Sequence, residues 1–137
     1  MRFMITLVLT LFTLILTAPP NNSIYIASGE ELRDQRLLKA ILQIETDNNP
    51  IAINWCELSH GSLQIRPCFV VEVNRILKIQ GKDERFTIVD ALDPAKSVKM
   101  FWIVQKFHNP TGDIYRGCKI HNGWGKSDYY EKVKRLI

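Results

Sequence analysis

Apolar side chains recur at helical spacing early in the chain. Ser28 is followed three residues later by Glu31, as in a capping box, and leucine and isoleucine then return every three or four residues up to Ile44. The polar run 47–50, which ends in proline, stops the pattern. We therefore predict a helix over about residues 30–45.

Two further patterns of this kind follow. Pro67 starts a second series of apolar residues at helical spacing, which Gly81 closes. Asp93 followed by Pro94 has the form of an N-cap and a first helical residue, and the apolar pattern behind it runs to about His108. Both segments are predicted to be helices that bury one face.

The rest of the chain carries shorter patterns. The turn sequence 109–112 precedes a short helix predicted over about residues 113–121, and a last helix is expected from Ser127. Residues 51–65, between the first and second helices, hold only short apolar pieces and favour a loop with weak strands. Together the patterns predict a mainly α single domain with a small irregular or short β lobe after the first helix.

The start of the chain differs from all of these segments. After a short basic start, residues 3–18 contain twelve apolar residues, four threonines and no charge. A membrane-spanning helix needs about 20 apolar residues, and this run is shorter. We expect residues 1–18 to be a signal peptide or a retained membrane anchor, residues 19–27 a linker and residues 28–137 the folded domain. Either alternative exports the domain, which would be periplasmic, secreted or tethered to a membrane.

Composition narrows the class of protein. The 137 residues are 46% hydrophobic and 23% charged, with a net charge of +4. These values are ordinary for a globular domain and exclude a disordered chain, a collagen and a membrane protein with several spans. Basic residues are spread along the chain, so we expect no nucleic-acid partner. A mildly basic surface suits an anionic polymer.

Three cysteines, Cys56, Cys68 and Cys118, leave two alternatives open. In an exported protein one internal disulfide can form, and the Cys56–Cys68 pair is favoured because it closes a short loop. Otherwise all three are buried thiols. Cys118 and His121 have the spacing of zinc ligands, with His108 as a third candidate. No second paired motif accompanies them, so we expect no metal and no cofactor.

Glu45 is the first candidate for chemistry. It ends the apolar face of the first predicted helix, where the negative end of the helix dipole disfavours a charged carboxylate. Partial burial beside Ile44 acts in the same direction. Both effects are expected to raise the pKa of Glu45, as a general acid needs. The alternative is a solvated glutamate in a frayed last turn.

Four further motifs follow this glutamate in a fixed order. The set is Glu45-Thr46, Pro50-Ile51-Ala52, Gly61-Ser62-Leu63-Gln64-Ile65, His121-Asn122-Gly123, and Tyr130 before Val133. It resembles the soluble lytic transglycosylase domain and the goose-type lysozymes. Their pattern is Glu-Ser, Pro-x-Ala, Gly-Leu-Met-Gln-Ile, Ala-Tyr-Asn-x-Gly and a Tyr before Val. The resemblance covers about residues 35–135, and the glycine motif begins 16 residues after the glutamate without a gap.

This resemblance implies a lysozyme-like fold and cleavage of peptidoglycan between N-acetylmuramic acid and N-acetylglucosamine. Glu45 would protonate the glycosidic oxygen and then act as a base. As a base it would take a proton from the muramyl 6-hydroxyl, giving a 1,6-anhydro product as in a lytic transglycosylase, or from water as in a lysozyme. The family often manages with one carboxylate, assisted by the substrate's acetamido group. The partner would be a glycan strand, in the setting of a bacterial secretion or conjugation apparatus or of a phage.

The resemblance also implies roles for substrate-binding residues. Gln64 and the backbone of the glycine motif would line the cleft, and Asn122 would hydrogen-bond the sugar. Tyr130 would orient Glu45 or the substrate. The full set expected around the substrate is Thr46, Gly61, Gln64, Ile65, His121, Asn122 and Tyr130. Trp124 is a further candidate for lining the cleft.

Some positions depart from the family's pattern. Thr46 keeps the hydroxyl of the family's serine and adds a methyl group. Ser62 and Leu63 replace leucine and methionine in the glycine motif. His121 stands where a tyrosine would precede the asparagine, and an imidazole can still stack and hydrogen-bond.

Two alternatives to a one-carboxylate enzyme stay open. Asp47 and Glu57 follow the first helix, and either would hold the water of an inverting hydrolysis if two carboxylates were used. The other alternative is a non-catalytic glycan-binding or structural relative of the same fold. The presence of Glu45 together with Gln64 and Asn122 favours the enzyme.

Overall fold

The computed structural model describes residues 28–123 and 128–137. The expected signal peptide or anchor (1–18), the linker (19–27), Trp124 and Ser127 therefore lie outside the described residues. Within the described residues the protein is mainly helical with one two-stranded sheet, which confirms the predicted fold class. None of the helices in these two ranges is long and apolar enough to cross a membrane.

The first helix, α1 (Gly29–Thr46), is close to its predicted bounds. Its N-terminus is a capping box, in which the Ser28 hydroxyl accepts from the Glu31 N–H at 3.2 Å and the Glu31 carboxylate accepts from the Ser28 N–H at 3.3 Å. Asp47 ends the helix with a left-handed backbone (φ 53°). This stop places Glu45 in the last turn.

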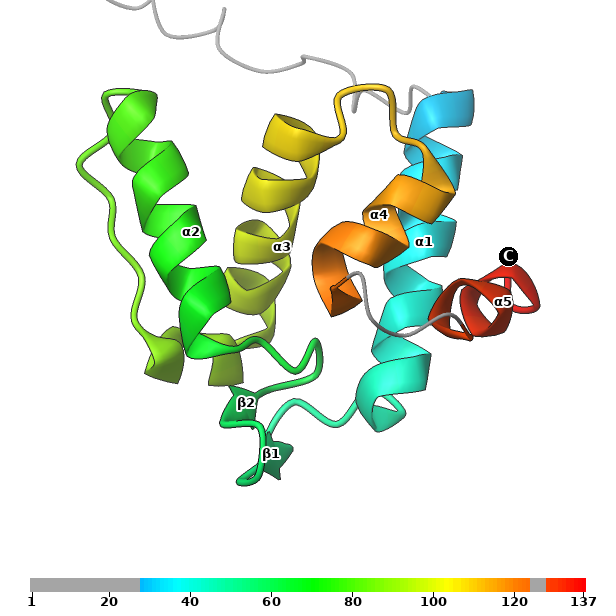
Figure 1. Cartoon of the computed structure of the whole chain (residues 1–137), viewed down its shortest axis with the longest axis horizontal. Helices are drawn as coiled ribbons and strands as arrows, with labels where there is room; N and C mark the ends of the chain where they lie inside the picture. Colours follow the sequence, from blue (N-terminus) through cyan, green and yellow to red (C-terminus); the bar gives the residue numbers. More distant parts are fainter. Residues whose placement is uncertain (1–27, 124–127) are drawn as a thin grey trace, which may run out of the picture.

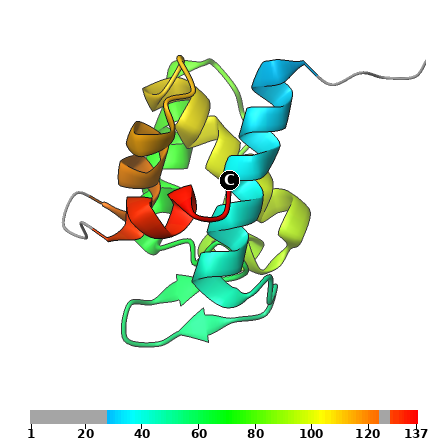
Figure 2. The same cartoon turned by 90° about the vertical axis from the view of Figure 1, so that its right-hand side faces the viewer.

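The small lobe after α1 is a short antiparallel hairpin. Strand β1 (Ile53–Asn54) pairs with β2 (Ser59–His60), and Ile53 lies opposite His60. The chain then bends back so that His60 and Ile65 exchange two backbone hydrogen bonds of 2.9 Å. Figure 2 shows the hairpin lying below the C-terminal end of α1. The expected weak strands are confirmed.

The next helices, α2 (Pro67–Ile79) and α3 (Pro94–His108), begin with proline as predicted. Between them lies a 3₁₀ helix, η1 (Ile88–Leu92), which the apolar pattern did not predict. Thr87 and Asp90 form a capping box there, and this was the available signal for η1. Figure 1 shows α2 and α3 running side by side.

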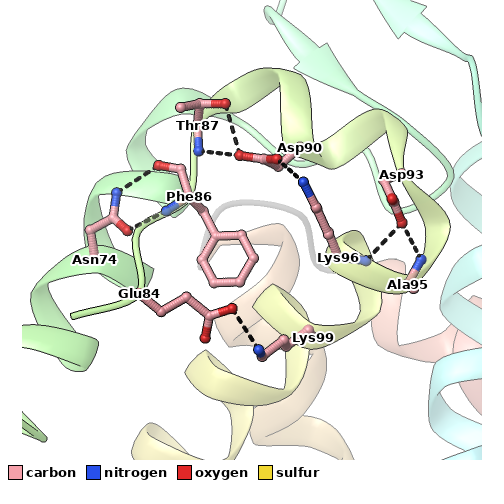
Figure 3. Close-up of polar contacts among 9 residues, drawn as sticks. All are labelled: Asn74, Glu84, Phe86, Thr87, Asp90, Asp93, Ala95, Lys96 and Lys99. Atoms are coloured by element: carbon pink, nitrogen blue, oxygen red, sulfur yellow. Dashed lines mark hydrogen bonds and ion pairs between the residues drawn. The ribbon is translucent and has the colours of Figure 1, made fainter. Parts of the chain in front are cut away.

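Polar side chains fix the connection from α2 to α3 (Figure 3). The Asn74 amide on α2 donates to the Phe86 carbonyl at 2.8 Å and accepts from the Phe86 N–H at 2.9 Å. Asp90 accepts from Thr87 and pairs with Lys96 on α3 at 2.6 Å. The connecting segment is thereby attached to both helices, which keeps η1 against β2.

Two short helices complete the domain: α4 (Ile114–Asn122) and α5 (Tyr129–Lys134). In Figure 1, α4 lies beside α3, and α5 lies against α4 and α1. The core between them contains Ile41, Phe101 and Val133, which are buried. Helices α1, α4 and α5 therefore meet near the C-terminal end of α1, where Glu45 lies.

Candidate active site

Glu45 is held by side chains from two other helices. The Tyr129 hydroxyl on α5 donates to Glu45 Oε1 at 2.7 Å, and His121 Nε2 on α4 lies 3.5 Å from the same oxygen. The Glu45 side chain is 18% exposed. Among the described residues no hydrogen bond reaches Oε2. The described contacts of the carboxylate are thus all made through Oε1.

The tyrosine that holds Glu45 is Tyr129, which corrects the prediction that Tyr130 orients Glu45; the alternative that Tyr130 orients the substrate stays a prediction. The Tyr130 ring packs edge-on against Tyr115 at 5.1 Å and lies under the Lys134 ammonium. Successive residues of a helix point about 100° apart, so the two tyrosines face different sides of α5. Tyr129 is buried, and burial and the charge of Glu45 raise its pKa. It therefore stays protonated as a hydrogen-bond donor.

His121 lies in an aromatic surrounding. Its side chain is only 4% exposed, and its ring meets Phe69 and Phe101 edge-on at 6.0 Å and 5.5 Å. Its Nδ1 is buried and has no hydrogen-bond partner within residues 28–123 and 128–137. The ring packs inward beside Glu45, so it has little exposed surface on which a sugar could stack.

The pKa of Glu45 is lowered, which contradicts the expectation of a raised value. Burial is the largest single cause and raises this pKa, as predicted, but the hydrogen bond and charge of His121, the hydrogen bond from Tyr129 and the charge of Arg66 together outweigh it. The ionised carboxylate is thus the form that the free site favours. Side chains that are distant in the sequence thus together outweigh the effect of burial.

The glycine motif forms a tight turn that is tied to α1. Gly61 has a left-handed backbone (φ +75°), and a Cβ atom there would lie 1.9 Å from the Ala91 carbonyl oxygen on η1. The Thr46 hydroxyl donates to the Ser62 carbonyl at 3.0 Å. Thr46 and Gly61 therefore join α1, the turn and η1. The described contacts of Thr46 and Gly61 are structural.

Gln64 is also bound within this lobe. It has a left-handed backbone (φ 47°), its amide nitrogen donates to the Gly61 carbonyl at 3.0 Å, and its amide oxygen accepts from the Ser59 hydroxyl at 2.7 Å. Gln64 and the buried Ile65 nevertheless line a pocket next to His121.

This pocket has a volume of about 280 Å³ and lies between the glycine turn, α2, α3 and α4. Its walls are Gln64, Ile65, Arg66, Cys68, Phe69, Glu72, Val104, His108, Ile120, His121 and Gly123. Glu72 pairs with His108 at 2.6 Å on its α2–α3 side, and Arg75 holds the pKa of Glu72 down at about 2. A larger hollow of about 510 Å³ lies between α1 and α3, and no predicted site residue lines it.

The other candidate residues have separate positions. Asn122 ends α4, and its amide nitrogen is buried without a partner in the part of the chain that the structure describes. Glu57 pairs with Arg66 at 3.0 Å on the exposed hairpin, and Asp47 is the exposed cap of α1. Neither acid is seen to share a hydrogen bond or ion pair with Glu45 among the described contacts.

All three cysteines are free thiols, so the favoured Cys56–Cys68 disulfide is not formed. Cys56 and Cys68 are exposed, and only Cys118 is buried. No group of three histidine, cysteine, aspartate or glutamate side chains among the described residues is arranged to hold a metal ion. The described hydrogen-bond partner of the His108 imidazole is Glu72.

Sequence reasoning missed Tyr129 and Arg66, which act on Glu45, and Phe69, which packs against His121. Two adjacent tyrosines, Tyr129 and Tyr130, pointed to a tyrosine near the acid. The sequence did not show which of them faces Glu45, because the rotational phase of a short helix cannot be predicted from so few residues. No family model, no curated protein and no solved structure matches this chain. The family resemblance therefore stays a prediction that rests on the motif residues.

Proposed function

We propose that this chain is a lytic transglycosylase or lysozyme that cleaves the MurNAc–GlcNAc bond of peptidoglycan, with Glu45 as its single catalytic acid and base. The observation that carries the proposal is the set of contacts that holds the Glu45 carboxylate. One oxygen is fixed by Tyr129 and His121, and the other has no described partner. A carboxyl group held in this way can exchange a proton at a fixed point.

The lowered pKa of Glu45 describes the site without substrate. A glycan lying over the carboxylate would remove its remaining contact with water, and removal of water disfavours the charged form. Substrate binding therefore moves Glu45 toward the protonated state that a general acid needs. Tyr129 and His121 keep Oε1 in place during this change.

In the proposed reaction Glu45 donates its proton to the glycosidic oxygen as that bond breaks. The carboxylate then takes a proton from the muramyl 6-hydroxyl or from water. Most glycosidases use a second carboxylate, but Glu57 is paired with Arg66 and Asp47 caps α1. We therefore assign the stabilisation of the sugar cation to the substrate's own acetamido group.

The proposed setting is outside the membrane. It rests on the apolar residues 3–18, which we take as an export signal or an anchor. Peptidoglycan strands are the proposed partner, in a secretion, conjugation or phage apparatus. The net charge of +4 favours contact with an anionic polymer.

One observation favours a second candidate, a non-catalytic glycan-binding relative. The free site keeps Glu45 ionised, and an ionised carboxylate is a hydrogen-bond acceptor for sugar hydroxyls. In that case the chain would bind glycan strands and leave them intact. The two candidates differ in whether soluble fragments are released.

The test is product analysis by mass spectrometry. The full chain is incubated with purified peptidoglycan sacculi, beside Glu45→Gln and the matched control Glu57→Gln. We expect fragments from the wild type and from Glu57→Gln, and none from Glu45→Gln. Anhydro-muramyl ends identify a transglycosylase and reducing ends a hydrolase. Sacculi that bind the folded wild type and stay intact would establish the glycan-binding candidate instead.

A further inference from the structure

Glu45 and His121 form a pair that is nearly enclosed by protein. Nε2 and Oε1 are 3.5 Å apart, and the imidazole is 4% exposed. A distance of this size is long for a hydrogen bond, but such contacts in ligand-free sites commonly shorten when substrate binds. Imidazole is also the side chain that exchanges a proton between about pH 5 and 8. The pair thus places a carboxyl group next to an imidazole with which it could exchange a proton.

The groups around the pair come from every element packed against it. Tyr129 on α5 donates to Oε1, and Arg66, before α2, acts on Glu45 through its charge. Phe69 on α2 and Phe101 on α3 contribute rings that meet the imidazole edge-on. The pocket that the imidazole lines also contains Arg66 and the Glu72–His108 pair, whose two side chains are 2.6 Å apart. The imidazole thus packs against aromatic rings and has charged groups across the pocket.

The two ring nitrogens of His121 differ in their partners: Nε2 faces Glu45, whereas Nδ1 does not. This atom is buried and has no partner within the described ranges. A positively charged imidazole that is buried with one N–H unpaired is costly, and the negative charge of Glu45 offsets part of that cost. If water leaves the carboxylate as well, a neutral pair is favoured over an ion pair.

We propose that His121 is a positioning residue that shares its proton with Glu45, so that the pair keeps an acid available when a lone carboxyl group would already be ionised. The proposal rests on the proposed function. As the glycan covers the site, the Nε2–H bond breaks and an O–H bond forms on Glu45, which leaves both side chains neutral. After Glu45 has protonated the glycosidic oxygen and taken up a proton as base, the reverse transfer restores the ion pair.

The first test reads the carboxyl group without any substrate. The full chain, kept in a mild detergent because of its apolar start, is labelled with ¹³C in the glutamate carboxyl groups. The Glu45 signal is then followed through a pH titration by NMR. We expect the midpoint to rise in His121→Gln, because the contributions of His121 that lower the pKa of Glu45 are gone. The control His108→Gln, whose imidazole pairs with Glu72, should leave that midpoint unchanged.

The second test is the pH profile of kcat/KM for peptidoglycan cleavage. In His121→Gln the proton is lost when Glu45 alone ionises, whereas the wild-type pair keeps one proton to higher pH. The alkaline limb of the kcat/KM profile should therefore lie at lower pH in His121→Gln than in the wild type, by about one pH unit or more. His121→Gln profiles that coincide with the wild type would overturn the proposal.

The two tests separate this proposal from the proposed function. A folded wild type that leaves sacculi intact, with a Glu45 midpoint that rises in His121→Gln, rejects the enzyme and keeps the coupled pair. A wild type that cleaves sacculi, with an unchanged midpoint and an unmoved limb, keeps the enzyme and rejects proton sharing. A His121→Gln protein is compared only after circular dichroism shows native helix content.

Discussion

At the residue scale the site depends on contacts between distant parts of the chain. Tyr129 reaches Glu45 across 84 positions of sequence. Of the two local effects expected at the end of α1, burial does raise the pKa of Glu45. The partners that reverse the outcome come from α4, from α5 and from Arg66 before α2, and no periodicity near residue 45 encodes them. The choice between Tyr129 and Tyr130 likewise required the phase of a helix of six residues.

The assignment to Tyr129 is tested by a pair of matched variants. Tyr129→Phe removes a hydrogen bond to a charged group and should lower the free energy of unfolding at pH 7 by about 2 kcal/mol. Tyr130→Phe keeps its ring contact with Tyr115 and should change it by less than about 0.5 kcal/mol. Urea denaturation measures both. Equal losses, or a larger loss for Tyr130→Phe, would contradict the assignment.

The pH dependence of the Tyr129→Phe effect follows from the direction of the Glu45 shift. A carboxyl group whose pKa is lower in the folded than in the unfolded state contributes stability above its unfolded pKa of 4.5, and this stability is lost as the pH falls through the folded pKa. The difference between wild type and Tyr129→Phe should therefore shrink below about pH 4.5. A difference that stays constant down to pH 3 would show that the hydroxyl does not act on the ionised carboxylate.

At the scale of elements, the longer helices were predictable because each has its own start and stop signals. The capping box at Ser28, the proline starts at Pro67 and Pro94, and the stop at Asp47 depend on neighbours in sequence. The hairpin and η1 were harder, because two-residue strands and one 3₁₀ helix carry too few apolar positions for a period. Their positions depend on Gly61, which lets the turn approach η1.

This role of Gly61 can be separated from simple backbone strain. Gly61 and Gly81 both have left-handed backbones, but a Cβ at Gly81 meets nothing within 4 Å, whereas one at Gly61 would overlap the Ala91 carbonyl. Gly81→Ala should therefore cost about 1–2 kcal/mol of unfolding free energy. Gly61→Ala should cost about 1–3 kcal/mol more, because backbone must move as well. Thermal and urea unfolding give both values, and equal costs would mean that the turn does not depend on this approach.

At the scale of the molecule, composition and periodicity identified a mainly α domain with a small β lobe, which the structure bears out. The cysteines were not predictable in the same way, since pairing depends on the distances between the β1–β2 turn, α2 and α4. The structure leaves Cys56 and Cys68 exposed, and burial raises the pKa of the Cys118 thiol to about 11. The rates at which the three thiols react therefore show whether Cys56 and Cys68 are free and whether Cys118 is buried.

Thiol counting with a chromogenic disulfide reagent at pH 8 tests this state. The native full chain should show two thiols that react rapidly, and the third should react only after denaturation, because the Cys118 thiol is buried and almost fully protonated at that pH. Cys118→Ala serves as the control and should keep both rapid thiols. A native protein with no rapid thiol and one in denaturant would show that Cys56 and Cys68 are joined after all.

The measurement that tests the central claim most directly is the initial rate of muropeptide release from purified sacculi by the full chain and by Glu45→Gln. Glutamine keeps the shape of the side chain and can still accept from Tyr129, but it has no proton to give. Loss of a general acid should lower the rate by at least about 100-fold, while circular dichroism and sacculus binding stay unchanged. A Glu45→Gln protein that releases muropeptides within about threefold of the wild-type rate would show that Glu45 is not the catalytic acid.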